Sequence, residues 1–344
     1  MKPRSVKQRR IRGLNGLRTL ALFGVLLFHT FPRVLPGGYF GVILFFVISG
    51  FLTACSSSAS RTMDIRSYYA KRAKRIYPSL VIMLCVTVEV LAAADRFRLA
   101  NAQEEILSVL LAYNNYWQIS KSADYFANLS ANSAFTHLWY IAILIQYEII
   151  WPWLYLFARR RHNSRTIGRI AFISLFIMPV LSFIPSVPSA MLYYGTFSRI
   201  HALLLGSWLG WRYSEQKHAS RVRPSASLLF LILFFAVSIL IFFTIPGSDI
   251  RIYRYGMVLY AAACCAAVRL VCDERNRIGI ALDRQPFEFF SKYSYEIYLW
   301  QYPVLFLFSI KGWNTNPGWY LLQFMILLIL SVWTNFIVSR LFRR

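Results

Sequence analysis

The chain has 344 residues, of which 57% are hydrophobic and 15% are charged, and its mean hydropathy is +0.47. Soluble domains are usually about 45–50% apolar and about 25% charged, so this composition excludes an ordinary soluble domain. The formal net charge of +24 would suggest nucleic-acid binding in a soluble protein, but Lys and Arg also collect in the cytoplasmic loops of membrane proteins. We therefore predict a membrane protein with no nucleic-acid partner.

Apolar segments of membrane-spanning length recur along the chain, and about 20 residues are enough to cross the hydrocarbon core. We predict an all-α, polytopic transmembrane bundle in which residues 1–344 form a single membrane domain, with no fused soluble domain. The ten predicted spans cover residues 14–32, 39–57, 78–94, 136–157, 167–184, 196–212, 225–245, 252–272, 287–310 and 319–340.

The charged residues indicate how these spans are oriented. If the N-terminus is cytoplasmic, most of the 38 Lys and Arg residues fall on the cytoplasmic side, as the positive-inside rule requires. The first apolar segment is long enough to span and lacks a small-residue cleavage pattern, so we predict a retained helix rather than a cleaved signal peptide. Both termini should then lie in the cytoplasm.

The segment covering residues 95–135 is the longest stretch between predicted spans and should face outward. Within it, Ala102–Ile119 has helical apolar spacing, with Glu104 and Glu105 in its first turn. This stretch is too polar for a spanning helix, so we predict an interfacial or re-entrant helix.

Cysteine usage argues against a cross-linked or metal-binding framework. All five cysteines fall within predicted spans or at their cytoplasmic ends, and they are Cys55, Cys85, Cys264, Cys265 and Cys272. We therefore expect neither a disulfide framework nor a metal site.

The first predicted span carries an arginine, Arg18, and a histidine, His29. They are 11 positions apart, which is three helical turns plus roughly 20°, so both lie on one face, about 16 Å apart along the axis. A snorkelling arginine and a hydrogen-bonded interfacial histidine are the structural alternatives. Charged groups inside a span are costly, however, and neutral imidazole is a suitable general base. The pair favours a functional site, with Arg18 toward the cytoplasm and His29 toward the outer leaflet.

The first two spans closely resemble the signature of the acyltransferase-3 family, in the segments GLNGLRTLALFGVLLFHT and GGYFGVILFFVISGFL. These bacterial integral-membrane enzymes O-acetylate cell-surface and secreted glycans. The family's Arg-x10-His pattern falls on Arg18 and His29, and its cytoplasmic Arg-x-x-Arg pattern falls on Arg72 and Arg75. Weaker matches extend the resemblance over almost the whole chain, and they are FTHLW (Phe135–Trp139), the segment of Arg199 and Gly206, and SYEIYLWQYP (Ser294–Pro303).

This resemblance implies a reaction and a location. The protein would transfer an acyl group, most simply acetyl, from cytoplasmic acetyl-CoA to a hydroxyl group of an exopolysaccharide, a lipopolysaccharide or a lipid-linked saccharide. It would act in the bacterial inner membrane, in contact with membrane lipids. Acetyl-CoA would be the donor substrate, and the resemblance implies no bound cofactor.

The resemblance also implies roles for individual residues. Arg72 and Arg75 would bind the phosphates of the acyl-CoA donor, whereas charge alone would place them in an ordinary positive-inside loop. Arg18 would hold the donor's pyrophosphate or stabilise the oxyanion that forms as the thioester is attacked. His29 would deprotonate the acceptor hydroxyl or carry the acyl group transiently.

Two positions depart from the family pattern. A histidine often precedes the proline of the ninth-span motif, and here that residue is Gln301, which cannot act as a base at neutral pH. The fourth-span glutamate is replaced by Leu144, and Glu148, one turn further on, is a candidate substitute. His137 and Arg199, at the outer ends of the fourth and sixth spans, are candidate acceptor-binding residues, with a snorkelling anchor as the alternative for Arg199.

Two other functions remain open. A transporter of a glycolipid or small anion would use the same polar interior, but it predicts paired discontinuous spans or internal repeats, and the sequence contains no repeat. A regulatory membrane subunit would leave Arg18 and His29 dispensable. Two intramembrane carboxylates, Glu89 and Glu296, need partners under every interpretation.

Overall fold

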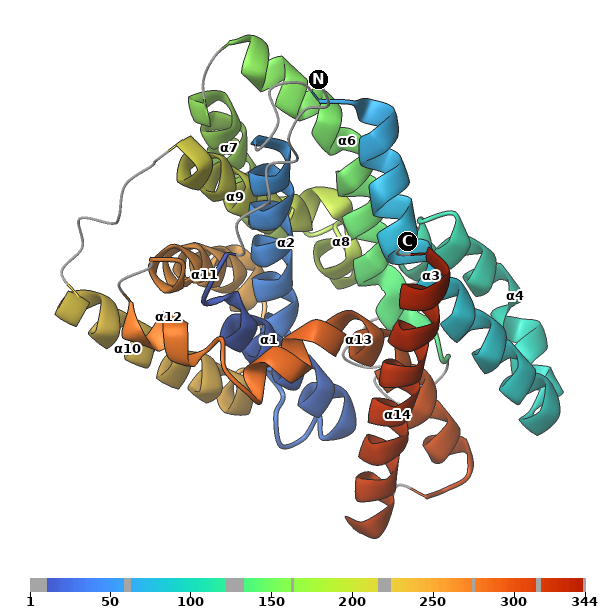
Figure 1. The fold of residues 1–344 in the computed structure, drawn as a ribbon. Helices are drawn as coiled ribbons and strands as arrows, with labels where there is room; N and C mark the ends of the chain where they lie inside the picture. The colour runs from blue at the N-terminus through green and yellow to red at the C-terminus, as the bar shows by residue number, and fades with distance from the viewer. Residues whose placement is uncertain are drawn as a thin grey trace, which may run out of the picture.

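The computed structural model describes residues 11–58, 63–121, 133–161, 164–215, 224–273, 276–313 and 317–342, and within these ranges it contains helices and no strand (Figure 1). The predicted all-α fold is therefore confirmed. The helices, including one 3-10 helix (η1) and one π-helix (η2), are α1 (Leu14–Thr30), α2 (Phe40–Ser58), α3 (Ile65–Ala94), α4 (Arg96–Leu110), α5 (Asn114–Ser120), η1 (Thr136–Leu138), α6 (Trp139–Arg160), α7 (Ser164–Ser182), α8 (Ser189–Tyr194), α9 (Thr196–Glu215), α10 (Pro224–Thr244), η2 (Ile252–Gly256), α11 (Met257–Val271), α12 (Arg277–Ala281), α13 (Phe287–Ile310) and α14 (Pro317–Phe342).

Each predicted span coincides with a helix, and seven helical segments among the described residues are long and apolar enough to cross a membrane. The helix α1 is apolar but has only 17 residues, and α9 and α13, which carry Arg199 and Glu296, are not among the seven. The structure confirms a multi-pass bundle, whereas the count of ten and the orientation stay predictions. The seven segments are Phe40–Ser58, Ile65–Ala94, Thr136–Arg160, Ser164–Ser182, Ser225–Thr244, Ile252–Val271 and Gly318–Phe342.

The first two helices lie in the interior, where between them they contact α6, α9, α11 and α13 (Figure 1). The helix α2 packs against α1, α9 and α11, and α1 also packs along α13, which in turn contacts α14. The corner between α1 and α2 is anchored to a third helix, because the Gly37 amide donates to the Phe242 carbonyl of α10 at 2.9 Å. The predicted hairpin is therefore enclosed by other helices.

The closest packing in the bundle is between α2 and α9, and glycines make it possible. A Cβ added at Gly50 would collide with the Leu203 carbonyl oxygen, and one added at Gly206 would collide with the Val47 carbonyl oxygen. The two backbones thus touch directly, as small residues commonly allow between membrane helices. This contact holds α2 in the position from which it reaches the interior cavity.

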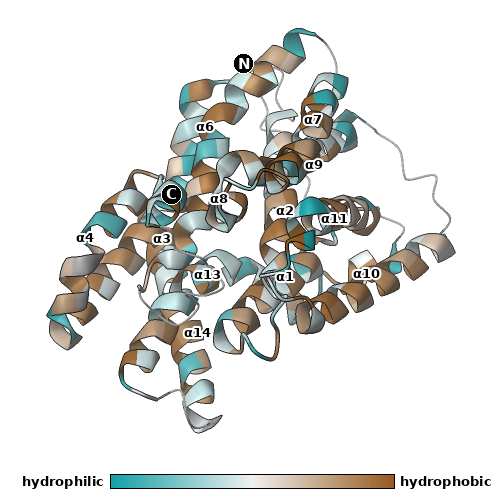
Figure 2. Ribbon diagram, turned by 180° about the vertical axis from the view of Figure 1, so that it is seen from behind, coloured by the Kyte–Doolittle hydropathy of each residue, from teal (hydrophilic) through white to brown (hydrophobic). Residues whose placement is uncertain are grey.

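The periphery of the bundle is apolar. Figure 2 shows predominantly hydrophobic residues along α10 and α14, which lie at the outside of the molecule. On α14, Leu321 is 65% exposed and Ile329 is 63% exposed. Soluble monomers rarely expose contiguous apolar surface of this kind, whereas a lipid-facing surface requires it.

The predicted outward segment contains two helices, α4 and α5, where a single helix over Ala102–Ile119 was expected. The chain breaks at Ala112, which takes a left-handed φ of 57°, and the Tyr113 amide then donates to the Ser108 carbonyl at 2.9 Å. The apolar spacing could not reveal this turn, because no glycine or proline marks it. Residues 122–132 of the same segment lie outside the described residues.

We expect Gly206→Ala to destabilise the protein, because the new methyl group would force α9 away from the backbone of α2. Gly256→Ala is a matched control, since its Cβ would meet its nearest neighbour at an ordinary 3.7 Å. Overpacking of this kind typically costs about 1–3 kcal/mol. Thermal unfolding of the two variants in detergent, followed by tryptophan fluorescence, checks this. Equal melting temperatures for the two variants would contradict the direct α2–α9 contact.

Candidate active site

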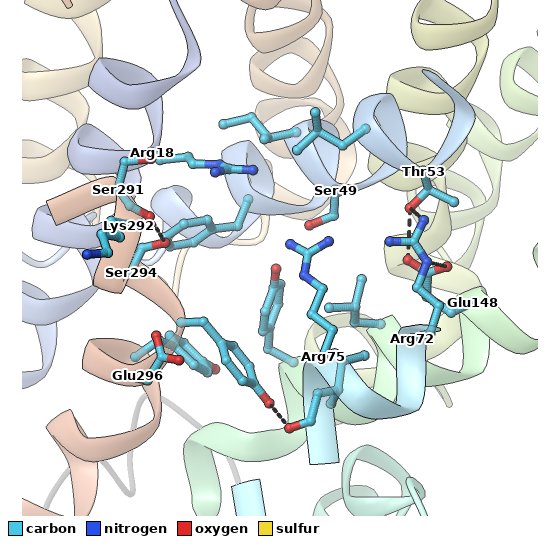
Figure 3. A pocket seen from close by; sticks show the side chains of 18 residues that line it. Arg18, Ser49, Thr53, Arg72, Arg75, Glu148, Ser291, Lys292, Ser294 and Glu296 are labelled. Atoms are coloured by element: carbon cyan, nitrogen blue, oxygen red, sulfur yellow. Dashed lines mark hydrogen bonds and ion pairs between the residues drawn. The ribbon is translucent and has the colours of Figure 1, made fainter. Parts of the chain in front are cut away.

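A cavity of about 180 Å³ lies among α1, α2, α3, α6 and α13 (Figure 3). It combines charged side chains with apolar and hydroxyl-bearing ones. Its wall consists of Arg18, Phe45, Ile48, Ser49, Leu52, Thr53, Arg72, Arg75, Ile76, Tyr140, Leu144, Glu148, Ser291, Lys292, Ser294, Tyr295, Glu296 and Tyr298.

Three arginines singled out in the sequence, Arg18, Arg72 and Arg75, line this one cavity. Arg72 and Arg75 are three residues apart on α3 and share a face, while Arg18 reaches the cavity from α1. Figure 3 shows the guanidinium groups of Arg18 and Arg75 pointing into the open space. Neither forms a hydrogen bond or an ion pair with any residue that the structure describes.

The cavity wall carries more positive than negative charge. Lys292 adds a fourth cation, and the carboxylates on the wall are those of Glu148 and Glu296. The Coulombic interaction between Arg18 and Arg75 is repulsive. Because like charges are unfavourable in a partly enclosed space, this wall is suited to an anion, and guanidinium groups bind phosphate bidentately.

Glu148 holds Arg72 in place. The Arg72 Nε lies 3.1 Å from Glu148 Oε2, and the Thr53 hydroxyl donates to Glu148 Oε1 at 2.8 Å. The Tyr68 hydroxyl donates to the same carboxylate, and Arg72 Nη2 donates to Ser56 Oγ at 3.1 Å. The structure thus places Glu148, the candidate substitute for the missing carboxylate, beside Arg72, where its contacts fix the orientation of that guanidinium group.

The two unassigned carboxylates have different environments. Glu296 is buried and accepts hydrogen bonds from Ser79 Oγ at 3.3 Å and from Asn335 Nδ2 at 3.0 Å, so it links α13 to α3 and α14. Glu89 lies exposed near the end of α3. Neither arrangement resembles a catalytic acid–base pair.

A second group of functional side chains surrounds Tyr302 on α13. The edge of the His29 imidazole meets the Tyr302 ring at a centroid distance of 5.1 Å, and the His137 ring stacks on it at 5.1 Å. The side chain of Gln301 also approaches His29. The structure therefore brings together His29 and His137, two residues 108 positions apart in the sequence. Tyr302, which sequence reasoning missed, lies between them.

His137 is held firmly by α13. Its Nε2 lies 3.1 Å from the Leu299 carbonyl oxygen, and because a carbonyl only accepts, this contact assigns the proton to Nε2. Its Nδ1 is buried and has no hydrogen-bond partner among the described residues. The Tyr298 hydroxyl donates to the His137 backbone carbonyl. His137 is thus a neutral imidazole with a bare acceptor nitrogen beside Tyr302.

Two tyrosines separate the cavity from the histidines. Tyr140 and Tyr298 both line the cavity and contact each other edge to face at 5.2 Å. The Tyr298 ring also lies 5.4 Å from the His137 ring. His29 does not line the cavity, so the two groups form adjoining half-sites on either side of this tyrosine pair.

Arg199 lies outside both half-sites. Its guanidinium group packs over the rings of Tyr193 and Trp139 at 4.4 Å and 5.6 Å, and Nε donates to the Tyr193 carbonyl at 2.7 Å. It is only 2% exposed and does not line the cavity. Such burial does not fit a snorkelling anchor, and acceptor binding by Arg199 stays a prediction.

A buried carboxylate in the outer segment was also missed. Glu105 of α4 is 1% exposed, accepts a hydrogen bond from Gln118 Nε2 at 2.8 Å, and accepts another from the Ser133 hydroxyl. It thereby connects α4 and α5 to the segment that leads into His137, and it interacts electrostatically with Tyr302. A sequence signal existed, because Glu105 lies on the same helical face as the apolar Ala102 and Val109.

Comparison with known proteins identifies the family of this membrane bundle. Residues 11–340 match the profile of a family described as an acyltransferase domain. No solved structure is matched.

Among characterised or named relatives, the chain is 30% identical over 308 residues to O-acetyltransferase OatA of Staphylococcus aureus (strain NCTC 8325 / PS 47), which covers 86% of this chain and 51% of the relative. It is 28% identical over 323 residues to the putative peptidoglycan O-acetyltransferase YrhL of Bacillus subtilis (strain 168), covering 90% of this chain and 51% of the relative. The chain thus spans about half the length of these relatives.

The fold defines a multi-pass membrane protein whose interior holds a cationic cavity and, beside it, a buried histidine. The chain belongs to the acyltransferase-3 family, because the family profile covers nearly all of it.

We expect Glu105 to make stability depend on pH. Burial raises the pKa of this carboxyl group from 4.5 to about 7, against the opposing effect of its hydrogen bonds. Between these values the folded protein keeps a proton that the unfolded chain loses, so the free energy of unfolding falls as pH rises from about 4.5 through 7. Thermal melting of the wild type and of Glu105→Gln between pH 5 and pH 8 should show a steeper decline for the wild type.

Glu104→Gln is the control for this series, since Glu104 is exposed and pairs with Lys121 at the surface. It should retain the wild-type pH profile. A Glu105→Gln protein whose melting temperature declines as steeply as that of the wild type would contradict the assignment.

Proposed function

We propose that the protein is a membrane O-acyltransferase that transfers an acetyl group from cytoplasmic acetyl-CoA to a hydroxyl group of a cell-envelope glycan. The proposal rests on the position of α1, which reaches both groups of side chains. Its Arg18 lines a cationic cavity, while its His29 lies among imidazole and phenol rings on the other side of the tyrosine pair. The printed names of the relatives, O-acetyltransferases, support acetyl as the transferred group.

The cationic cavity is the proposed donor site. Acetyl-CoA carries a pyrophosphate and a 3′-phosphate, and of the three arginines on the cavity wall, Arg18 and Arg75 have no hydrogen bond or ion pair with a described residue. Arg72 is already oriented by Glu148 and completes the cluster. We assign Arg18 to the donor's phosphates rather than to the oxyanion, because it lies three helical turns from His29.

His29 is the proposed general base. It takes the proton of the acceptor hydroxyl as that oxygen attacks the thioester carbonyl, which forms a C–O bond and an oxyanion. Collapse of this intermediate breaks the C–S bond, and the imidazolium returns the proton to the CoA thiolate. In the alternative relay, the His29 imidazole attacks the thioester carbonyl and the CoA thiolate leaves; the acetyl group then passes from His29 to the hydroxyl, whose proton goes to that thiolate. In both cases the pantetheine arm has to pass Tyr140 and Tyr298.

The acceptor is proposed to approach from the opposite side of the membrane. In this topology the ten helices span the bacterial inner membrane with both termini in the cytoplasm, and residues 95–135 face outward. The donor cavity then opens toward acyl-CoA, and His137 lies on the acceptor side. An exopolysaccharide, a lipopolysaccharide or a lipid-linked saccharide supplies the hydroxyl; peptidoglycan is named for the Bacillus relative.

We expect Arg75→Gln to weaken acetyl-CoA binding about 10- to 100-fold, because a hydrogen bond to a charged group contributes about 1.5–3 kcal/mol. Lys74→Gln is the matched control, since Lys74 precedes Arg75 on α3, is exposed and does not line the cavity. Isothermal titration of purified protein with acetyl-CoA measures both. Equal affinities of the two variants for acetyl-CoA would contradict the assignment of the cavity as the donor site.

We expect His29→Ala to lower acetyl transfer at least about 100-fold while leaving acetyl-CoA affinity unchanged, because the base is lost and the donor site is not. The measurement uses protein in nanodiscs with radiolabelled acetyl-CoA and envelope glycan, and it follows label in the glycan and release of free CoA. A wild-type rate of acetyl transfer in this variant would contradict the mechanism. In a parallel assay with the protein in sealed vesicles, label that crosses the vesicle membrane without release of CoA would instead identify a transporter.

A further inference from the structure

A second cavity, also of about 180 Å³, lies between α1, α13 and α14. Most of its wall is apolar and includes Phe23 and Leu27 of α1 and Phe324 and Leu327 of α14. This volume has room for about six water-sized groups, so it fits a short stretch of a chain rather than a whole lipid. The proposed acyl transfer gives this cavity no role.

One polar side chain on the wall of this cavity, Gln301, lacks a hydrogen-bond partner among the described residues. Gln301 is only 3% exposed, and neither Nε2 nor Oε1 forms a hydrogen bond of normal geometry with a described residue. An unsatisfied buried polar group costs about 1–3 kcal/mol, so a ligand that supplies a donor and an acceptor here gains that energy back. Since Gln301 also approaches His29, such a ligand would place its polar end next to the proposed base.

The surroundings of the cavity indicate how a ligand reaches it. Phe23, Leu27 and Phe324 are partly exposed, and the neighbouring surface of α14 displays Leu321 and Met325, which are 65% and 51% exposed. In a membrane this surface contacts hydrocarbon rather than water. A hydrocarbon chain can therefore enter from the bilayer, whereas a water-soluble polymer would have to cross apolar surface to do so.

We propose that this cavity binds the lipid-proximal hydrocarbon of a lipid-linked saccharide acceptor, with the first polar group of that lipid at Gln301 and the saccharide hydroxyl at His29. This inference rests on the proposed acyl transfer and narrows its acceptor to the lipid-linked class. The chain enters between α1 and α14, and the amide of Gln301 receives the polar group that follows it. The donor approaches the same base from the cationic cavity on the far side of the tyrosine pair.

The first test measures binding without catalysis. The probe is a farnesyl glycoside of N-acetylglucosamine with a photoreactive diazirine on the farnesyl chain, added to full-length protein in nanodiscs. Labelled peptides are mapped by mass spectrometry. We expect label concentrated on α1 and α14 at the cavity, and at least about tenfold less of it in Leu327→Phe, whose larger side chain fills the space. Label spread evenly over all lipid-facing helices would overturn the proposal.

Leu322→Phe is the matched control, because Leu322 lies on α14 but does not line the cavity. It should label like the wild type. Gln301→Leu covers the case in which Leu327→Phe fails to fold. Removing an unpaired buried amide should raise its melting temperature while reducing labelling, a combination that a purely structural glutamine would not produce. Unchanged labelling in Gln301→Leu would overturn the assignment of the polar group.

The second test separates this inference from the proposed function. Acetyl transfer is measured with the farnesyl glycoside and with free N-acetylglucosamine as acceptors. At least tenfold higher kcat/KM for the farnesyl form supports the lipid-linked acceptor. Equal values, with transfer still dependent on His29, would overturn the cavity assignment and leave the acyltransferase intact. Specific labelling without acetyl transfer to either acceptor would overturn the proposed function and, with it, the acceptor role of the cavity.

Discussion

The structure depends on how it accommodates an arginine within the apolar helix α1. A guanidinium group in a membrane span has to be surrounded by polar groups or a water-filled space, because exposure to hydrocarbon costs several kcal/mol. Arg18 meets this requirement by opening into a cavity that hydroxyl and charged side chains from four other helices complete.

The helix α13 joins the two half-sites. Its first turns supply Ser291 and Lys292 to the cationic cavity, and about three turns further on Gln301 and Tyr302 lie beside His29. Since α13 packs along α1, the distance between the anion-binding groups and His29 is set by two adjacent helices rather than by loops. Rigid elements of this kind hold catalytic groups more accurately than loops do.

Glu148 illustrates why the partners of a buried charged residue can be identified only from the tertiary structure. The sequence pattern suggested that it replaces the missing fourth-span carboxylate, since it follows Leu144 by one turn. Its hydrogen bonds instead go to Thr53, Tyr68 and Arg72, which come from α2 and α3. Helical spacing within α6 could not reveal which neighbouring helix that face would meet.

The sequence by itself determined the all-helical membrane class, the location of the helices, the family and the pairing of Arg18 with His29 on one face. These features follow from local composition, helical periodicity and a specific motif, none of which requires long-range contacts. Only the tertiary structure decided that Arg18, Arg72 and Arg75 share one cavity, that His29 meets His137 across Tyr302, and that Gln301 lines a separate apolar space. Those facts depend on which helix faces pack together, and apolar faces buried among other apolar helices carry too little sequence signal to specify their partners.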